Sequence, residues 1–243
     1  MNLFNDEVYL QLPSSPGYSQ HWDSERKMLF VQIPDGELIY APHFFEQKIS
    51  DRSMDYLLEN GSHDWTKVDW KSINPAEVKW TNISWQHDSI SMFGKKIPLP
   101  RYSAWYGNDD KPYTYSGLTL QPKPWNKGLL YLKEQIEPIA NVTFNSVLLN
   151  WYRNGEDSIS WHTDAEPELG KNPVIVSVNF GTTRKFQLRR RDDNKQRFDV
   201  PLQHGTLLVM AGETQHFWQH SVPKEPKIVG NRLNLTFRVI KGR

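Results

Sequence analysis

An imidazole and a carboxylate stand two residues apart in Trp161-His162-Thr163-Asp164. In an extended chain, residues i and i+2 project from the same face, so this stretch presents two potential metal ligands together. The sequence contains no cysteine, so any metal must be held by nitrogen and oxygen. A His-X-Asp tripeptide arises often by chance and also fits a surface turn. A metal site therefore needs a third ligand from elsewhere in the chain.

Three histidines downstream could supply that ligand. His216 and His220 have the spacing of a helical zinc pair, but no Glu lies between them and Pro223 follows closely, which argues against a helix. His204 precedes Gly205 in a predicted turn and is interpreted as structural. His220 lies in a predicted loop before the last strand and is the candidate third ligand. Two histidines and one carboxylate on one face leave the opposite metal positions open, as in non-haem Fe(II) oxygenases.

The last predicted strand, Arg232-Leu233-Asn234-Leu235-Thr236-Phe237-Arg238, carries polar residues at every even position and apolar residues at every odd one. Arginine pairs bidentately with carboxylates, so two arginines on one face favour a small dicarboxylate between them. The alternative is a half-exposed strand with both arginines in solvent. Asn150 and Tyr152 also share a strand face and could donate hydrogen bonds to the same acid, or be ordinary polar groups at the edge of a core.

The elements that must position these residues are mainly short strands. Asn154-Gly155 is typical of a tight hairpin turn because both residues accept positive φ. A first helix is predicted from Ser50, as N-cap, to Gly61, and a second ends at Asn141. The predicted strands cover 146–152, 159–162, 173–179, 185–190, 206–210 and 232–240; the second helix is predicted from the spacing of Leu129, Leu132, Ile136 and Ile139.

These elements predict an α+β, mainly β fold: a barrel or jelly roll with flanking helices. Residues 1–35 are interpreted as an irregular N-terminal arm and residues 36–243 as a single catalytic domain. Within that domain, we expect a core at about 142–243 and a region that recognises the substrate at about 85–120. Any site would be built inside the barrel.

Composition narrows the class of protein. The chain has 243 residues, with 10 Trp, 10 Tyr and 11 Phe, which favours one globular domain over a disordered chain. No apolar stretch approaches the roughly 20 residues of a membrane helix, so no membrane partner is expected. Residues 1–18 lack the basic start and apolar run of a secretory signal. We therefore expect an intracellular monomer, in the cytoplasm of a prokaryote or the nucleus of a eukaryote.

From about Ile90 to Ile240, about three-fifths of its length, the chain resembles the AlkB family of Fe(II)- and 2-oxoglutarate-dependent dioxygenases, in the branch that repairs alkylated DNA. The order and spacing of the shared motifs carry the resemblance. They are Phe93-Gly94-Lys95, Pro100-Arg101, Trp105-Tyr106-Gly107, Tyr113-Thr114-Tyr115-Ser116-Gly117, Asn150–Tyr152, His162-Thr163-Asp164, His220-Ser221-Val222-Pro223 and Arg232–Arg238.

The resemblance implies a double-stranded β-helix, the jelly-roll fold, with iron bound by His162, Asp164 and His220. It implies that 2-oxoglutarate chelates this iron near Arg238. It also implies oxidative demethylation of 1-methyladenine or 3-methylcytosine in DNA, with release of succinate, CO2 and formaldehyde. The remaining residues implied to bind 2-oxoglutarate are Arg232, Asn234, Asn150 and Tyr152.

Enzymes of this kind flip the damaged base out of the helix. The resemblance implies that Tyr115 and the ring of His162 sandwich the base, and that Phe93 wedges into the vacated position, although Phe93 fits equally well as a packing residue of a hairpin. The residues implied at the edge of the base are Tyr113, Ser116 and Glu166.

Basic residues concentrate between Arg184 and Arg197. This segment contains seven basic and two acidic residues, although the whole chain has a net charge of only +1. This segment, which contains Arg189, Arg190 and Arg191, fits a hairpin that contacts phosphates, and Arg101 adds charge near the expected base pocket. A solvated face is the plainer interpretation of a charge run.

Two other functions fit the same residues. The iron chemistry could act on RNA, or on a protein or lipid, because nothing in the sequence separates ribose from deoxyribose. A non-catalytic β-barrel that binds nucleic acid would require the metal-ligand pattern and the alternation of Arg232–Arg238 to be coincidental.

Overall fold

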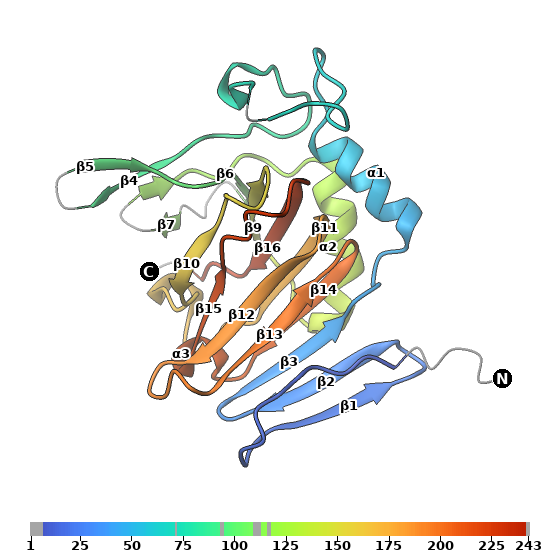
Figure 1. The fold of residues 1–243 in the computed structure, drawn as a ribbon, viewed down its shortest axis with the longest axis vertical. Helices are drawn as coiled ribbons and strands as arrows, with labels where there is room; N and C mark the ends of the chain where they lie inside the picture. Colours follow the sequence, from blue (N-terminus) through green and yellow to red (C-terminus); the bar gives the residue numbers. More distant parts are fainter. Residues whose placement is uncertain (1–6, 71, 93–94, 109–112, 116–117, 242–243) are drawn as a thin grey trace.

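Two facing β-sheets form the centre of the computed structural model, which describes residues 7–70, 72–92, 95–108, 113–115 and 118–241 (Figure 1). Strand pairing within both sheets is antiparallel. The larger sheet contains, in spatial order, β1 (Ser19–Asp23), β2 (Met28–Ile33), β3 (Gly36–Ala41), β14 (Thr206–Ala211), β11 (Ile175–Gly181), β16 (Arg232–Arg238), β9 (Ser146–Tyr152) and β6 (Tyr102–Gly107). The smaller sheet contains β10 (Ile159–His162), β15 (Trp218–Val222), β12 (Arg184–Arg190) and β13 (Arg197–Leu202). The predicted mainly β jelly roll is confirmed.

Alternation along the central strands separates the two faces of the larger sheet. In β16, Leu233, Leu235 and Phe237 are fully buried and pack in the same apolar cluster as the helices. The alternate residues of the same strand line a cavity between the two sheets; they are Arg232, Asn234, Thr236 and Arg238. Because side chains in a strand point to opposite faces in turn, one strand supplies both core and site.

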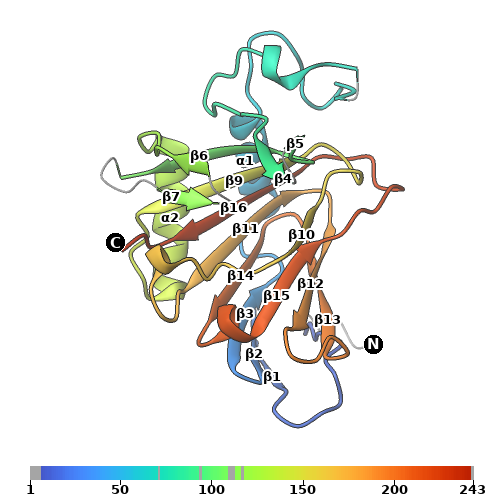
Figure 2. The same ribbon diagram turned by 90° about the vertical axis from the view of Figure 1, so that its left-hand side faces the viewer.

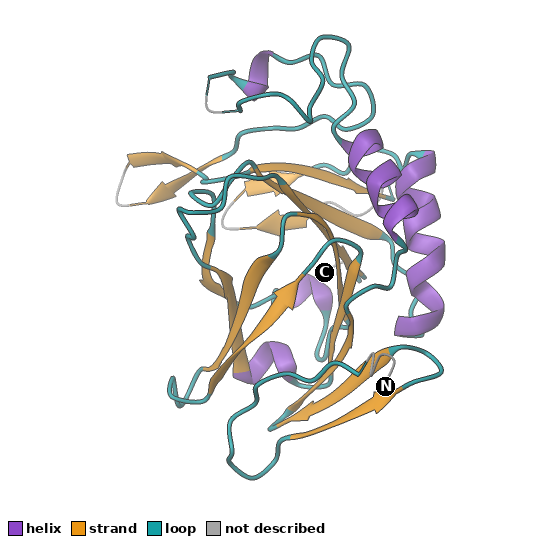
Figure 3. Cartoon of the chain, turned by 45° about the vertical axis from the view of Figure 1, so that its right-hand side comes forward, coloured by secondary structure: helices purple, strands orange, loops and turns teal. Residues whose placement is uncertain are grey.

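Two helices, α1 (Gln47–Leu57) and α2 (Lys127–Ala140), pack against the larger sheet on the face turned away from the cavity (Figure 3). The side chain of Asn126 caps α2 by accepting a hydrogen bond from the backbone N–H of Leu129, at 3.0 Å. Asn141 ends the helix in the left-handed conformation, with φ of 51°. The second predicted helix is therefore confirmed, together with its apolar face.

The predicted bounds of the first helix are wrong. α1 begins at Gln47 and ends at Leu57, so Ser50 lies within its first turns rather than at the N-cap. Ser50 is fully buried, and its hydroxyl donates to the carbonyl of Phe45 at 3.1 Å. The sequence pattern could not distinguish a serine that caps a helix from one that turns inward to a preceding carbonyl.

Residues 19–33 correct the prediction of an irregular arm over residues 1–35. They form β1 and β2, and β2 pairs with β3, which joins the larger sheet through β14. Leu29, Val31 and Ile33 are buried in the core. Pairing of β2 with β3, and of β3 with the distant β14, stabilises a hairpin whose own sequence signal is weak.

Asn154-Gly155 does not close a hairpin, which corrects a second prediction. β9 and β10 belong to different sheets, so this turn carries the chain from one sheet to the other. Neither residue has a positive φ. Glycine is required here by close approach, because a Cβ atom on Gly155 would lie 1.8 Å from the carbonyl oxygen of Glu225. His220, expected in a loop, lies on β15.

In the part of the chain that the structure describes, no helix is long and apolar enough to cross a membrane.

The remaining short elements surround the two sheets. These short elements are two hairpins, β4 (Ser89–Met92) with β5 (Lys95–Pro98) and β7 (Tyr113–Tyr115) with β8 (Leu118–Leu120); two 3-10 turns, Pro75–Glu77 and Pro167–Leu169; and helix α3 (Thr214–Phe217).

Replacement of Asn126 by Ala should lower the free energy of unfolding by about 1 kcal/mol, because the N–H of Leu129 loses its acceptor at the start of α2. Asn126→Asp keeps an acceptor and should stay close to the wild type. Urea denaturation measures both. Equal stability of the alanine variant and the wild type would contradict the assigned cap.

Candidate active site

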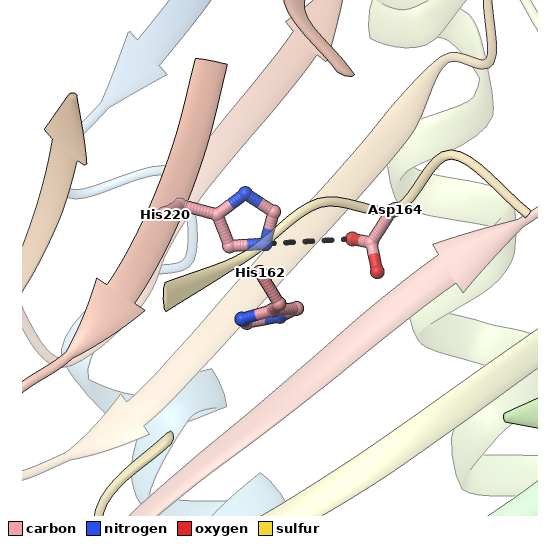
Figure 4. A group of neighbouring side chains, drawn as sticks. All are labelled: His162, Asp164 and His220. Atoms are coloured by element: carbon pink, nitrogen blue, oxygen red, sulfur yellow. Dashed lines mark ion pairs between the residues drawn. The ribbon is translucent and has the colours of Figure 1, made fainter. Parts of the chain in front are cut away.

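Three potential metal ligands converge at the inner end of the smaller sheet. Strand pairing places His162 of β10 directly opposite His220 of β15, and Asp164 follows two residues after His162. One ligand atom from each of the three residues lies within 4.8 Å of the others. Nε2 of His220 is 3.7 Å from Oδ2 of Asp164 (Figure 4). Three protein ligands leave the remaining positions of a bound metal open, as non-haem iron sites require.

Neighbouring groups fix the orientation of the three ligands. The guanidinium of Arg238 donates from Nη2 to Oδ1 of Asp164 at 2.5 Å, so Oδ2 is the oxygen turned toward His220. Nδ1 of His162 lies 2.8 Å from the carbonyl oxygen of Ser160, so Nε2 is the nitrogen left for a metal. These contacts hold the ligand set in place through groups that are not themselves ligands.

The protonation states suit metal binding. Burial lowers the pKa of both imidazoles, that of His220 to about 3, so both rings are neutral at pH 7 and keep a lone pair. Burial alone would raise the pKa of Asp164. The nearby Arg238 and the two histidines outweigh that effect and hold the pKa of Asp164 below its usual value. Two neutral nitrogens and one carboxylate are the donor set expected for Fe(II).

A second feature of the same cavity is a buried arginine that lacks part of its hydrogen bonding. Arg232 is 1% exposed, and its Nη2 donates to Oδ1 of Asn179 at 2.6 Å. Among the described residues, its Nε and Nη1 have no hydrogen-bond partner. Burial lowers its pKa to about 10. Two unsatisfied donors on a buried cation fit a carboxylate ligand, which would accept from both.

Polar side chains complete the wall beside Arg232. Asn234 donates to Oγ of Ser177 at 2.8 Å and accepts from Thr236 at 3.1 Å. Ser177 and Asn179 come from β11, which pairs with β16, and the sequence patterns did not single them out. The cavity is lined by Leu148, Asn150, Tyr152, Ile159, His162, Asp164, Ser177, Phe186, Met210, His220, Val222, Arg232, Asn234, Thr236 and Arg238.

The structure thus brings the predicted metal ligands and the five predicted 2-oxoglutarate residues to one cavity, and Arg101 is hydrogen-bonded to one of the residues that line it. Arg101 is 4% exposed and donates from Nε to Oδ1 of Asn150 at 2.9 Å. It was predicted to bind the substrate by adding charge near the base pocket. Its hydrogen bond also makes it a support for Asn150, and its contact with substrate stays a prediction.

The other predicted substrate residues lie in different surroundings. Tyr113 and Tyr115 lie on β7, and Glu166 is half-buried just before the turn Pro167–Leu169. The predictions for Phe93 and Ser116 fall outside the described residues.

The arginines of the basic segment separate into two kinds. Arg190 is 8% exposed, and its guanidinium binds Asp192 and Asp35 at distances of 2.6 to 2.8 Å. Its charge is compensated inside the protein, so it is poorly placed to contact a phosphate. Arg189 and Arg191 are more exposed and bind only neutral groups.

Comparison with known proteins agrees with this geometry. The model of the 2OG-Fe(II) oxygenase superfamily matches residues 37–238, which include the whole ligand set. Human alpha-ketoglutarate-dependent dioxygenase alkB homolog 3 is 48% identical over 238 residues, covering 91% of this chain and 81% of that protein. The chain belongs to the AlkB family of 2-oxoglutarate- and Fe(II)-dependent oxygenases. It is therefore an Fe(II)- and 2-oxoglutarate-dependent dioxygenase.

Other members of the AlkB family are similar to this chain over shorter stretches or at lower identity. Bovine alkB homolog 3 is 50% identical over 173 residues, which cover 68% of this chain and 58% of that protein. The human DNA oxidative demethylase ALKBH2 is 42% identical over 158 residues, which cover 62% of this chain and 60% of that protein. The solved structure of OsALKBH1 matches 83% of this chain and 97% of its own, with a TM-score of 0.53 and 18% identity, and so supports the fold.

Sequence patterns missed one residue that touches the metal site. Gln215, on α3, is 1% exposed, and its Oε1 accepts a hydrogen bond from the backbone N–H of Asp164 at 2.9 Å. Asp164 lies just beyond the end of β10, where no neighbouring strand pairs with its backbone. Gln215 therefore replaces a strand partner and fixes the chain that carries the carboxylate. In the sequence, Gln215 is one of several polar residues between the apolar strand β14 and His220, and nothing else marks it as a site residue.

Replacement of Gln215 by Leu should weaken binding of Mn(II), a redox-stable substitute for Fe(II), by about 10- to 100-fold, because groups that support metal ligands contribute on this scale. Calorimetric titration measures the affinity. Gln219→Leu changes a nearby glutamine on the other face of β15 and should bind Mn(II) normally. Unchanged affinity in the Gln215 variant would show that the backbone of Asp164 needs no such support.

Proposed function

We propose that this AlkB-family enzyme demethylates N-methylated nucleobases in DNA, of the 1-methyladenine and 3-methylcytosine type, using O2 and 2-oxoglutarate and releasing succinate, CO2 and formaldehyde. The observation that carries the proposal is one cavity that holds both an open-faced His162–Asp164–His220 set and an arginine with two donors free to bind a carboxylate. The name of the relative ALKBH2, a DNA oxidative demethylase, supports the substrate class.

The residues that line the cavity would have different roles. His162, Asp164 and His220 would bind Fe(II) from one side and leave the other side open to co-substrate and O2. When bound, Fe(II) would activate O2, which is the oxidant: one oxygen atom oxidises 2-oxoglutarate to succinate and CO2, and the other hydroxylates an N-methyl carbon. Arg238 orients the carboxylate of Asp164 through Oδ1 and lies beside the position proposed for the 2-oxo acid end.

Arg232 would hold the distal carboxylate of 2-oxoglutarate with its two available donors, Nε and Nη1. Tyr152 covers the guanidinium, with its ring centre 4.9 Å from Cζ of Arg232. Apolar side chains close the rest of the cavity and exclude water from the reacting groups. They are Leu148, Ile159, Phe186, Met210 and Val222.

The base would enter beside His162, which is the most exposed of the three ligands. We propose that its ring and Tyr115 of β7 sandwich the base, with Tyr113, Ser116 and Glu166 at the base edge and Phe93 in the vacated duplex position. A carboxylate at that edge suits a cationic methylated base. A methyl group on the pairing edge also lowers the cost of flipping, because it weakens the base pair.

His162→Ala and Asp164→Ala should each abolish release of formaldehyde from a methylated oligonucleotide, because two remaining ligands cannot hold iron in the open geometry. Formaldehyde and succinate are measured together, and circular dichroism checks that both variants fold. His204→Ala, which changes a histidine that binds Asp51 outside the cavity, is the matched control and should keep activity. Full activity in either ligand variant would end the proposal.

Arg232→Ala should raise the KM for 2-oxoglutarate by at least about 100-fold, because the variant has no guanidinium to pair bidentately with the distal carboxylate. Arg232→Lys keeps the charge without the fork and should fall between the alanine variant and the wild type. Steady-state succinate formation at varied 2-oxoglutarate gives both values. An unchanged KM in the alanine variant would show that Arg232 does not bind the distal carboxylate of 2-oxoglutarate.

A further inference from the structure

The smaller sheet contains four strands in the order β10, β15, β12 and β13 (Figure 2). Its outer face, which is turned away from the cavity, carries a row of side chains that crosses all four strands. Strand pairing places Gln219 of β15 opposite Arg189 of β12, and Arg189 opposite Arg197 of β13. Trp161 of β10 completes the row, because its ring contacts Arg189. At the usual spacing of strands, the row is about 14 Å long. We call these four residues the outer row.

The outer row contains a rigid stack. Cζ of Arg189 lies 4.2 Å from the ring centre of Trp161. Both Nε and Nη2 of Arg189 donate to Oε1 of Gln219, at 3.1 and 2.9 Å. The guanidinium is therefore held over the indole by a neutral partner, so its charge is not compensated. A flat cation on an aromatic ring is a surface on which a nucleobase can stack.

The charges of the outer row also lack carboxylate partners. Arg189 and Arg197 stand directly opposite each other, and like charges in that position destabilise a sheet. Among the described residues, neither arginine has a carboxylate within ion-pair distance, whereas Arg153 and Arg184 each have one and Arg190 has two. Two opposed, uncompensated arginines indicate that an anion from outside the protein stabilises this face.

Acidic residues near the outer row are already engaged. Asp192 binds Arg190, Asp193 accepts from the backbone N–H of Lys195, and Asp199 accepts from Gln187. In the turn that joins β12 to β13, Arg191 and Lys195 are exposed and extend the positive surface. Asp193 and Asp199 accept from neutral groups and keep their charge, but the basic side chains of this surface, Arg189, Arg191, Lys195 and Arg197, outnumber these two carboxylates.

We propose that the outer row binds a single-stranded segment of the nucleic acid next to the nucleotide that enters the cavity, with a base on the Trp161–Arg189 stack and phosphates on Arg189 and Arg197. This inference rests on the proposed function. Trp161 directly precedes the ligand His162, so the row begins at the edge of the site. An unpaired strand is favoured over a duplex because only unstacked bases expose a face to the stack.

Binding of an unmodified, fluorescein-labelled single-stranded 15-mer, measured by anisotropy at several salt concentrations, tests the proposal. Arg189→Gln with Arg197→Gln should flatten the plot of log affinity against log salt by about 1.4, or about 0.7 for each phosphate that is no longer neutralised. Trp161→Ala should weaken binding about 10-fold, and Trp161→Phe, which keeps a ring, should restore most of it. Lys48→Gln with Arg52→Gln, on the exposed surface of α1, is the matched control and should bind normally.

An unchanged salt slope in the double arginine variant, or equal weakening of duplex and single-strand binding by Trp161→Ala, would overturn the proposal. Formaldehyde release by the wild-type protein is measured separately. If the wild type releases none while the outer-row variants lose binding, only the proposed demethylation fails. If the wild type demethylates and the variants bind normally, only the outer row fails.

Discussion

A cation buried without a carboxylate partner is the constraint on which the rest of this structure depends. Arg232 is nearly inaccessible to solvent, and transferring a guanidinium out of water costs several kcal/mol unless it is paired. Arg238, on the same strand face, is compensated by Asp164, whereas Arg232 donates to the neutral Asn179 and has no carboxylate within ion-pair distance among the described residues. The cavity therefore has a place for one more negative charge, which the distal carboxylate of 2-oxoglutarate would supply in the function proposed above.

The fold meets this constraint by strand register. Antiparallel pairing sets Asn234 of β16 opposite Asn150 of β9 on one side and opposite Asn179 of β11 on the other. Three neighbouring strands thus place polar side chains in one row on the cavity face, while their alternate residues pack under the helices. A shift of one residue would exchange the two faces and bury the arginines in the apolar core, so register and site are specified together.

The smaller sheet uses the same alternation for two different surfaces. On β15, His220 points into the cavity and Gln219 points outward to Arg189; on β10, His162 points inward and Trp161 lies against that same arginine. The metal ligands and the outer row are therefore carried by the same short strands. Oxidation inside the barrel and capture of a strand outside it would share one rigid support, which keeps the reacting nucleotide in register with its neighbours.

The sequence by itself determined what depends on local spacing: His162 with Asp164, the polar face that ends at Arg238, and the second helix, because these patterns follow from strand and helix periodicity. The tertiary structure alone decided what depends on distant pairing. Gln215, on α3, reaches the metal site through its hydrogen bond to Asp164, and β3 joins the larger sheet through β14, which lies far along the chain. Such contacts leave no periodic trace in the chain, since their partners lie tens of residues away.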